Sequence, residues 1–145
     1  MPAGAGVYNF PVGSLSSYAP VMLTFPAGTI AGSVVVTTRD GDNGDILATN
    51  INAFRSVNRD WTVNTQGGIQ FSTFGAKFSW SAQDQDPNFD YNNAVVAKYA
   101  DNFWIYPSVS TRESNSIQVD TILGTGVFQI GKGCAFTKIT TQPKS

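Results

Sequence analysis

The sequence predicts an all-β protein, a two-sheet antiparallel β-sandwich of about eight or nine short strands with an Ig-like or jelly-roll strand order. Three observations predict this fold class. The 145 residues include 14 Gly and 7 Pro but only one Glu and five Lys, so turn formers are abundant and strong helix formers are scarce. Apolar and polar residues alternate at the period of two that half-buried strands show. Such segments recur at near-regular spacing along the chain.

The first third of the chain predicts three strands before a polar loop. These strands are residues 7–13, 18–26 and 30–38. Pro11 cannot donate a backbone hydrogen bond, so the first strand is expected to lie at a sheet edge or to end there. Pro26-Ala27-Gly28 separates the second strand from the β-branched third. After the polar residues 39–45, residues 46–51 are the one place where a short helical turn is expected.

The largest apolar side chains at period two lie between Arg55 and Trp80, in two expected strands. The inward-facing residues are Val57, Arg59, Trp61 and Val63 in the first strand and Phe74, Ala76, Phe78 and Trp80 in the second. Gln66-Gly67-Gly68 supplies a turn between them, so the two strands are expected to form a hairpin with both tryptophans on its inner face. Each aromatic ring removes roughly 150 to 250 Å² from water, and this hairpin is therefore expected at the centre of the core.

The last third of the chain predicts four more strands. These are residues 93–99, 103–107, 116–122 and 126–131. Asp101-Asn102 marks the turn between the first two of them, and Leu123-Gly124-Thr125 separates the last two. We expect one domain over residues 1–145, with its core at about 7–132 and residues 133–145 as a tail or an extra strand.

Charge and hydropathy argue against two classes of partner. Nine basic residues against ten acidic ones, with no run of Lys or Arg, predict no nucleic-acid partner. No stretch approaches the ~20 apolar residues of a membrane span, so no membrane insertion is expected. The single cysteine, Cys134, cannot form an internal disulfide. Low charge with abundant Thr, Ser, Asn and Gly is common in exported β-proteins, and if the protein is exported, the sequence begins after the signal.

Six motifs occur along the chain in an order that is similar to that of one protein family. They are Tyr8-x-Phe10-Pro11-Val12-Gly13, Tyr18-Ala19-Pro20-Val21, Arg55-Ser56-Val57-Asn58-Arg59-x-Trp61, the aromatic-alternating strand that ends at Trp80, Val96-x-Lys98-Tyr99 with Trp104, and Phe128-Gln129-Ile130-Gly131. From about Val7 to Lys132 the chain resembles a repeated β-domain of Bacteroidetes secreted and cell-surface proteins that use the type IX secretion system. The resemblance implies an extracellular, adhesin-like β-sandwich module and transfers no catalytic residues.

The residue types argue against an enzyme. The chain has no histidine, which removes the commonest general base and most zinc sites. Glu113 is the single glutamate, so a glycosidase would need Asp84 together with Asp86 or Asp90 in one cleft. We therefore predict no catalytic residues.

A calcium ion is the one cofactor that the sequence could hold. Asp40, Asp42, Asn43 and Asp45 place several oxygens within six residues, as calcium loops require. The pattern is not an EF-hand, because position five from Asp40 is Gly44 and position twelve is Ile51. Asp and Asn also form ordinary Asx-turns in hairpin loops, and this alternative stays open. Residues 84–90 form a second acidic loop of the same kind.

Two aromatic residues are the candidate contacts for a glycan or protein partner. Trp104 and Tyr106 share one face of the segment 103–107, which has apolar residues on both faces. A place in the core is the alternative reading for both. Arg59 lies among inward-facing apolar residues, so it is expected to pair with an acid or to stack on an aromatic ring in a structural role.

Two functions follow from these observations. The first is a non-catalytic extracellular structural module of a bacterial surface or secreted assembly, whose partners are copies of itself or neighbouring modules. It would assemble into filaments by strand addition, with Val7–Val12 or Lys132–Ser145 as the donated segment. The second is a carbohydrate-binding or calcium-dependent adhesin module that uses Trp104, Tyr106 and the loop from Asp40 to Asp45.

Overall fold

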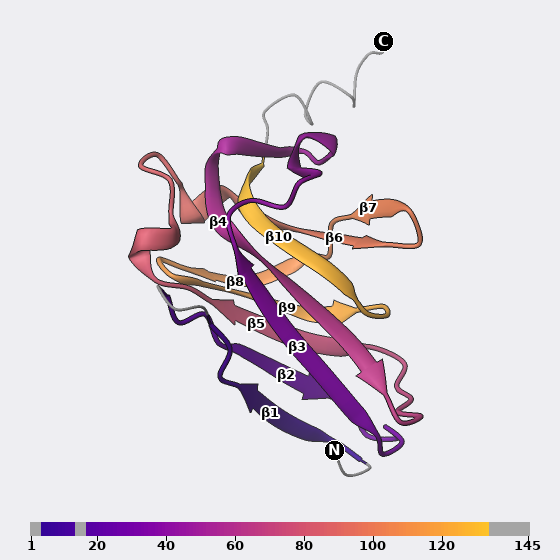
Figure 1. The fold of residues 1–145 in the computed structure, drawn as a ribbon. Coiled ribbons are helices and arrows are strands. Elements are labelled where there is room, and N and C mark those ends of the chain that lie inside the picture. Colours follow the sequence, from indigo (N-terminus) through magenta and orange to yellow (C-terminus); the bar gives the residue numbers. More distant parts are fainter. Residues whose placement is uncertain (1–3, 14–16, 134–145) are drawn as a thin grey trace.

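The computed structural model of this chain describes residues 4–13 and 17–133, which form two antiparallel sheets of five strands each. The strands are β1 (Gly6–Phe10), β2 (Val21–Phe25), β3 (Ser33–Asp40), β4 (Ile51–Gln66), β5 (Phe74–Ser79), β6 (Ala94–Ala100), β7 (Phe103–Ile105), β8 (Val109–Glu113), β9 (Ser116–Ile122) and β10 (Gly126–Gly133). The first sheet has the order β1-β2-β5-β9-β8 and the second sheet β3-β4-β10-β6-β7 (Figure 1). The predicted fold class, an all-β two-sheet sandwich, is confirmed.

The predicted central hairpin is wrong, because its two strands lie in different sheets. β4 belongs to the second sheet and β5 to the first, and the chain crosses between them over residues 67–73. Their inward faces meet across the core, where the rings of Trp61 and Phe78 lie 5.2 Å apart and those of Trp61 and Trp80 6.5 Å apart. Alternation at period two predicts which residues of a strand face the core. It does not distinguish two neighbouring strands of one sheet from two strands that face each other across the core, because both pairs alternate in the same way.

Several other predicted elements are present with shifted ends. β1 is an edge strand of the first sheet, as Pro11 predicts, and the expected helical turn is the 3₁₀ turn η1 (Ile46–Ala48). Two further 3₁₀ turns, η2 (Ala82–Asp84) and η3 (Tyr91–Asn93), flank the second acidic loop. The sequence did not predict β8. Four of its five residues are exposed, so the strand shows no alternation between apolar and polar residues.

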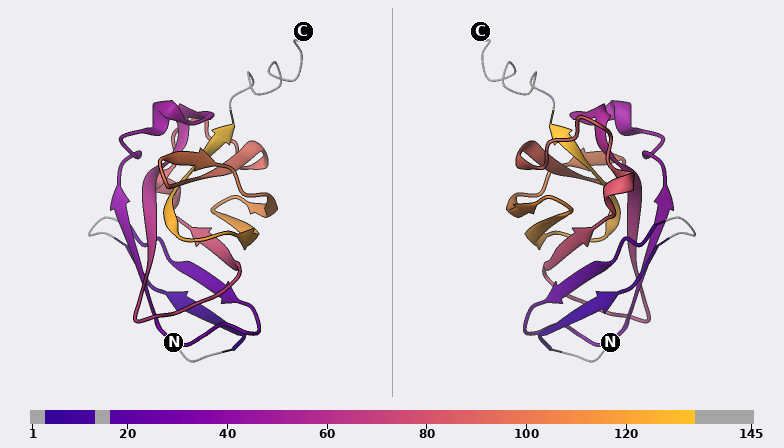
Figure 2. Two further views of the ribbon diagram at one scale, coloured as in Figure 1. Left: turned by 90° about the vertical axis from the view of Figure 1, so that its right-hand side faces the viewer. Right: turned by 90° about the vertical axis from the view of Figure 1, so that its left-hand side faces the viewer.

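The core fills the space between the two sheets, whose layers can be followed from the sides in Figure 2. Its largest fully buried apolar side chains are Trp61, Phe25, Phe74, Phe78, Phe128 and Leu23. Residues 40–50 continue from β3 and lie against the outer face of the second sheet. There Ile46 packs in a smaller cluster with Ile51 and Ala97. The outer face of the second sheet is therefore partly covered by its own chain.

Candidate functional site

The side chains of the predicted calcium loop contact separate protein partners. Asp40 Oδ1 lies 2.7 Å from Arg59 Nη2, whereas Asp42 Oδ1 accepts a hydrogen bond from Ser56 Oγ at 2.5 Å. Asn43 Oδ1 accepts one from the backbone N of Asp45 at 2.8 Å, which is an Asx-turn. No three His, Cys, Asp or Glu side chains within residues 4–13 and 17–133 form a group that could hold a metal ion. The four predicted ligands are not brought together, and calcium binding stays a prediction.

Asn43 and Gln129 fasten this loop to the second sheet. The backbone N of Asn43 donates to Gln129 Oε1 at 2.8 Å, and Asn43 Nδ2 donates to Asp60 Oδ2 at 3.0 Å. Gln129 is fully buried on β10, where its Nε2 donates to the carbonyl oxygen of Val57 at 2.8 Å. Arg39 Nη2 pairs with the same Asp60 carboxylate at 2.5 Å. The loop is thus held by buried polar groups on β4 and β10, which accounts for its composition without a ligand.

The two acidic loops, which are far apart in sequence, meet at Ser56 of β4. The Ser56 hydroxyl oxygen lies 2.5 Å from Asp42 Oδ1, 3.2 Å from Asp86 Oδ2 and 3.2 Å from Asn58 Oδ1. Asp86 also accepts from the backbone N of Ser56 and from Asn58 Nδ2, both at 2.8 Å. One hydroxyl proton can be donated to only one of these three oxygens, so the cluster is rich in acceptors.

The Asp42 carboxyl is the group in this cluster whose ionisation the fold disfavours. Burial raises the pKa of Asp42 and is the largest effect. The hydrogen bond from Ser56 lowers this pKa, and the nearby charge of Asp86 raises it. Sequence reasoning missed this cluster, since the two loops are separated by β4 and β5 and only pairing in space brings Asp86 to Ser56.

Arg59 is fully buried and paired with two acids, as its position among inward-facing residues predicts. Its Nε lies 3.2 Å from Asp84 Oδ2, and its Nη1 donates to Thr38 Oγ1 at 3.0 Å. Ser17 Oγ donates to the same Asp84 oxygen at 2.6 Å. Asp84 and Asp40 also line a shallow hollow at the surface together with Asn58 and Gln83. The acids at this hollow neutralise a buried guanidinium, which is a structural role.

Trp104 and Tyr106 both lie toward the segment that carries η1, but they differ in exposure. The Trp104 ring is half-buried, lies 5.2 Å from the Tyr99 ring at a tilt of 52°, and packs against the cluster of Ile46, Ile51 and Ala97. Tyr106 is 41% exposed, and its hydroxyl accepts from the backbone N of Asn50 at 2.9 Å. Tyr106 lines a shallow apolar groove of about 180 Å³ with Ile105, Pro107, Thr121, Ile122 and Leu123. Of the two predicted contact residues, Tyr106 is the more exposed.

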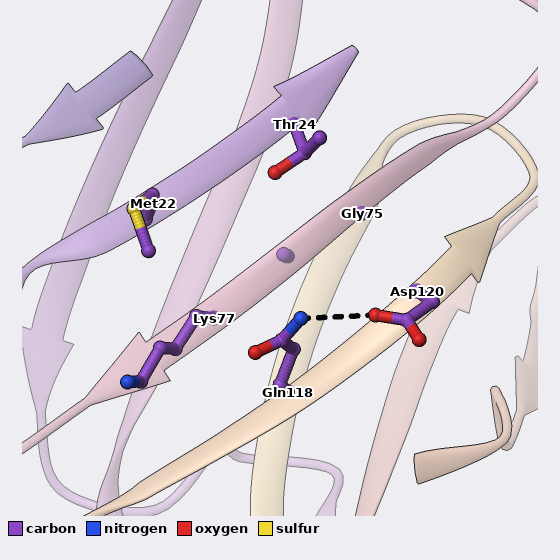
Figure 3. Close-up of a pocket in the computed structure, with 7 residues that line it drawn as sticks. Met22, Thr24, Gly75, Lys77, Gln118 and Asp120 are labelled. Carbon is purple, nitrogen blue, oxygen red and sulfur yellow. Dashed lines mark hydrogen bonds between the residues drawn. The ribbon is translucent and has the colours of Figure 1, made fainter. Parts of the chain in front are cut away.

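A second hollow, of about 270 Å³, lies on the outer face of the first sheet (Figure 3). It is lined by Met22, Thr24, Gly75, Ala76, Lys77, Gln118 and Asp120. Gln118 Nε2 donates to Asp120 Oδ1 at 3.0 Å along β9. A Cβ atom at Gly75 would lie 3.2 Å from the carbonyl oxygen of Asp120, next to an irregularity in the pairing of β5 with β9. Close approach of the strands thus explains the glycine at this position.

The four edge strands of the two sheets differ in how well they are protected. β1 has five residues and is followed by Pro11, and β7 has three residues and is followed by Pro107. β8 has an irregular register with β9 and ends in the charged residues Arg112 and Glu113. β3 also ends in charged residues, Arg39 and Asp40, but it has eight residues in regular register, and its residues 33–38 include no proline, charge or bulge. Natural sheets use those three devices to block edge pairing, so β3 is the least protected edge.

The direction of the backbone groups along β3 follows from its pairing with β4. The backbone N of Gly41 donates to Asn58 O at 2.8 Å, and the register continues as Asp40 with Arg59. Hydrogen-bonded and non-bonded pairs alternate in an antiparallel ladder, so Val34, Val36 and Thr38 direct their N–H and C=O groups away from β4. Within the described ranges no strand pairs with that side of β3. It is an open template for one more strand.

Over residues 4–13 and 17–133 the fold is an antiparallel β-sandwich, and β3 is the least protected of its four sheet edges. Comparison of the chain with protein-family models, with curated proteins and with solved structures finds no match. The described ranges contain no helix that is both long and apolar enough to cross a membrane.

Proposed function

We propose that this protein is a non-catalytic extracellular module of a bacterial surface or secreted assembly that associates with copies of itself by strand addition. The observation that carries the proposal is the open edge of β3, an eight-residue strand without proline, charge or bulge over residues 33–38. Backbone hydrogen bonds along such an edge provide affinity for an added strand. The resemblance to a repeated β-domain of Bacteroidetes surface proteins supports the extracellular setting.

The environment of the acidic side chains supports a non-catalytic role. Asp84 neutralises the buried Arg59, and Asp60 pairs with Arg39 and Asn43. Asp86 accepts hydrogen bonds from the backbone N of Ser56 and from Asn58 Nδ2. A general acid or base has to reach a substrate proton, and these carboxylates are instead occupied by structural contacts.

The proposal is tested by the molar mass of the full chain in light scattering over a concentration series, followed by electron microscopy of large species. We expect mass to rise with concentration. Val34→Pro removes an outward N–H group without removing a bond to β4, so it should keep the protein monomeric. Val34→Ala shortens the same side chain but keeps the N–H, and it should associate like the original chain. A monomer at every concentration for the original chain would contradict the proposal.

A glycan-binding or calcium-dependent adhesin module is the second candidate function. Two observations favour it: the exposed ring of Tyr106 beside an apolar groove, and the excess of oxygen acceptors around Ser56. A glycan array with and without chelator tests it, with Tyr106→Ala as the variant that should lose binding. Saturable binding that is lost in chelator would support an adhesin, and silence from a folded protein would count against it.

A further inference from the structure

We propose that the strand added to β3 is the β3 strand of a second copy, so that two copies join their second sheets about a two-fold axis. The pairing rests on the self-association proposed above and names the surface that each copy contributes. That surface is the uncharged run of residues 33–38, whose sequence is Ser-Val-Val-Val-Thr-Thr.

The direction of the backbone groups restricts how two β3 strands can pair. A two-fold axis perpendicular to the sheet makes the two strands antiparallel. The two residues of a hydrogen-bonded pair then exchange both N–H···O bonds, so both must direct these groups away from their own β4. In the run 33–38 the residues that do so are Val34, Val36 and Thr38, because the alternate residues bond to β4. A ladder between two copies can therefore use only these three residues of the run.

The register centred on Val36 pairs all three of them. Val34 lies opposite the partner's Thr38, and Val36 lies opposite the partner's Val36. By symmetry, Thr38 lies opposite the partner's Val34. Each of these pairs contributes two backbone hydrogen bonds.

Shifting the centre by one residue in either direction is less favourable. A centre at Val35 would move Thr38 opposite a residue that lies outside β3. A centre at Thr37 would move Asp40, whose side chain is 56% exposed, opposite the apolar side chain of the partner's Val34. In the register centred on Val36, the charged end of β3 stays beyond the paired run.

The same register matches the side chains on both faces of the sheet. Val34 and Val36 pack toward the core, and each lies opposite a β-branched residue of the partner. On the outer face, Val35 is 39% exposed and lies opposite the partner's Thr37. β-branched side chains pack well against their neighbours on a pleated surface. The contact would therefore cover an exposed valine as well as satisfy the backbone groups.

The β3 strand of a second copy suits this edge better than the other described edge strands do. β1 and β7 are shorter than β3 and are followed by Pro11 and Pro107. β8 has an irregular register with β9 and ends in charged residues. Such devices block edge pairing. Among the described edges, β3 itself is the one that matches the length and regularity of the run 33–38.

Pairing of two identical edges predicts a closed assembly. An isologous contact uses the same patch on both subunits, so a dimer has no second β3 edge with which to extend. The molar mass in light scattering should therefore level off at twice the monomer mass. The filaments expected from the sequence are not expected from this contact, and continued growth beyond the dimer would overturn it.

Disulfide trapping between two full-length variants tests the pairing and its register. In the register centred on Val36, Val35 and the partner's Thr37 form a non-hydrogen-bonded pair with Cα atoms about 4.5 Å apart. A disulfide spans Cα separations of about 4.4 to 6.8 Å. Both variants carry Cys134→Ser, which removes the single cysteine. One of them adds Val35→Cys and the other adds Thr37→Cys.

The matched control is a mixture of Val7→Cys and Asn9→Cys variants in the same Cys134→Ser background. These two exposed residues are also two positions apart on an edge strand, β1, which is not part of the proposed contact. Circular dichroism verifies that every variant is folded.

Under mild oxidation, the equimolar mixture of the Val35→Cys and Thr37→Cys variants should form a disulfide-linked dimer faster than either variant alone and faster than the control mixture. Equally fast cross-linking of either variant with itself would overturn the assigned register. If the original chain associates but no β3 cysteine cross-links faster than the control, the pairing of β3 with itself is wrong. If the original chain is monomeric at every concentration, the proposed function fails as well.

Discussion

Arg59 Nε lies 3.2 Å from Asp84 Oδ2 at a point where the side chain of Arg59 is fully buried and that of Asp84 is 10% exposed. Arg59 belongs to β4 of the second sheet, and Asp84 ends η2, which follows β5 of the first sheet. The pair therefore connects the two sheets at one end of the sandwich. Asp40, 56% exposed, is the second acid on the same guanidinium at 2.7 Å.

Asp84→Ala is expected to destabilise the protein by about 3 kcal/mol, the lower end of the range for breaking a buried ion pair, because Asp40 still contacts the guanidinium. Urea denaturation followed by tryptophan fluorescence measures this change. Asp40→Ala is the matched control and should cost less than about 1 kcal/mol, since an exposed partner contributes little. Equal effects of the two substitutions would show that the burial of Asp84 does not matter.

Trp61→Phe is expected to lower the free energy of unfolding by about 1 kcal/mol more than Trp80→Phe does. This difference is the typical net contribution of one hydrogen bond. Trp61 Nε1 donates to the carbonyl oxygen of Ala19 at 3.1 Å, whereas the buried Trp80 Nε1 has no acceptor among the described residues. Both substitutions shorten an aromatic side chain in the same core, so the loss of packing is similar. Chemical denaturation of the two variants gives the difference, and a larger loss for Trp80→Phe would contradict the assignment.

Asp42→Asn is expected to raise the melting temperature at neutral pH. The pKa of Asp42 is higher in the folded state than in the unfolded chain, so the ionised carboxylate costs stability above the folded pKa. That cost disappears as pH falls through the folded pKa toward the unfolded value of about 3.9. Melting curves from about pH 7 to about pH 3 should therefore converge for the two proteins. Asp45→Asn, in the exposed part of the same loop, is the control for the change in net charge.

Gly131→Ala is expected to destabilise the protein by about 1–3 kcal/mol, as overpacked cores do. A Cβ atom at Gly131 would lie 2.5 Å from Ile51 Cγ2 and 3.0 Å from Ser56 Cα, in a part of β10 where the register with β4 shifts. Gly133→Ala is the control, because the nearest atom to its Cβ would be 3.4 Å away. Differential scanning calorimetry compares the melting temperatures of the two variants. Equal values would contradict the prediction, because they would show that β4 shifts to make room for the added methyl group.

The local sequence pattern predicted the structure correctly where one residue type restricts the backbone, or where alternation determines which face of a strand is buried. Pro11 predicted an edge strand, and β1 is one. Alternation at period two placed Val57, Trp61, Phe78 and Trp80 toward the core, where all four are buried. The same alternation placed Arg59 inside and left either an acid or an aromatic ring as its partner, and the pairs with Asp84 and Asp40 show that acids fill this role.

Relations between distant segments were beyond the reach of that pattern. The hairpin of β4 and β5 was expected and is absent, because side-chain period reports the face of a strand and not the sheet to which the strand belongs. Asp86 reaches Ser56, thirty residues away, only through the packing of its loop on β4. β8 escaped prediction because both of its faces are polar.

The sequence by itself determined the all-β class, the residues that face the core and the inward position of Arg59, since these depend on backbone geometry and burial at single positions. The tertiary structure alone decided which strands are neighbours and where the acidic loops meet. Among the described strands it also left β3 as the sheet edge with the longest run free of proline, charge and bulge. Strand order depends on long-range hydrogen-bond pairing, and many pairings satisfy the same alternation.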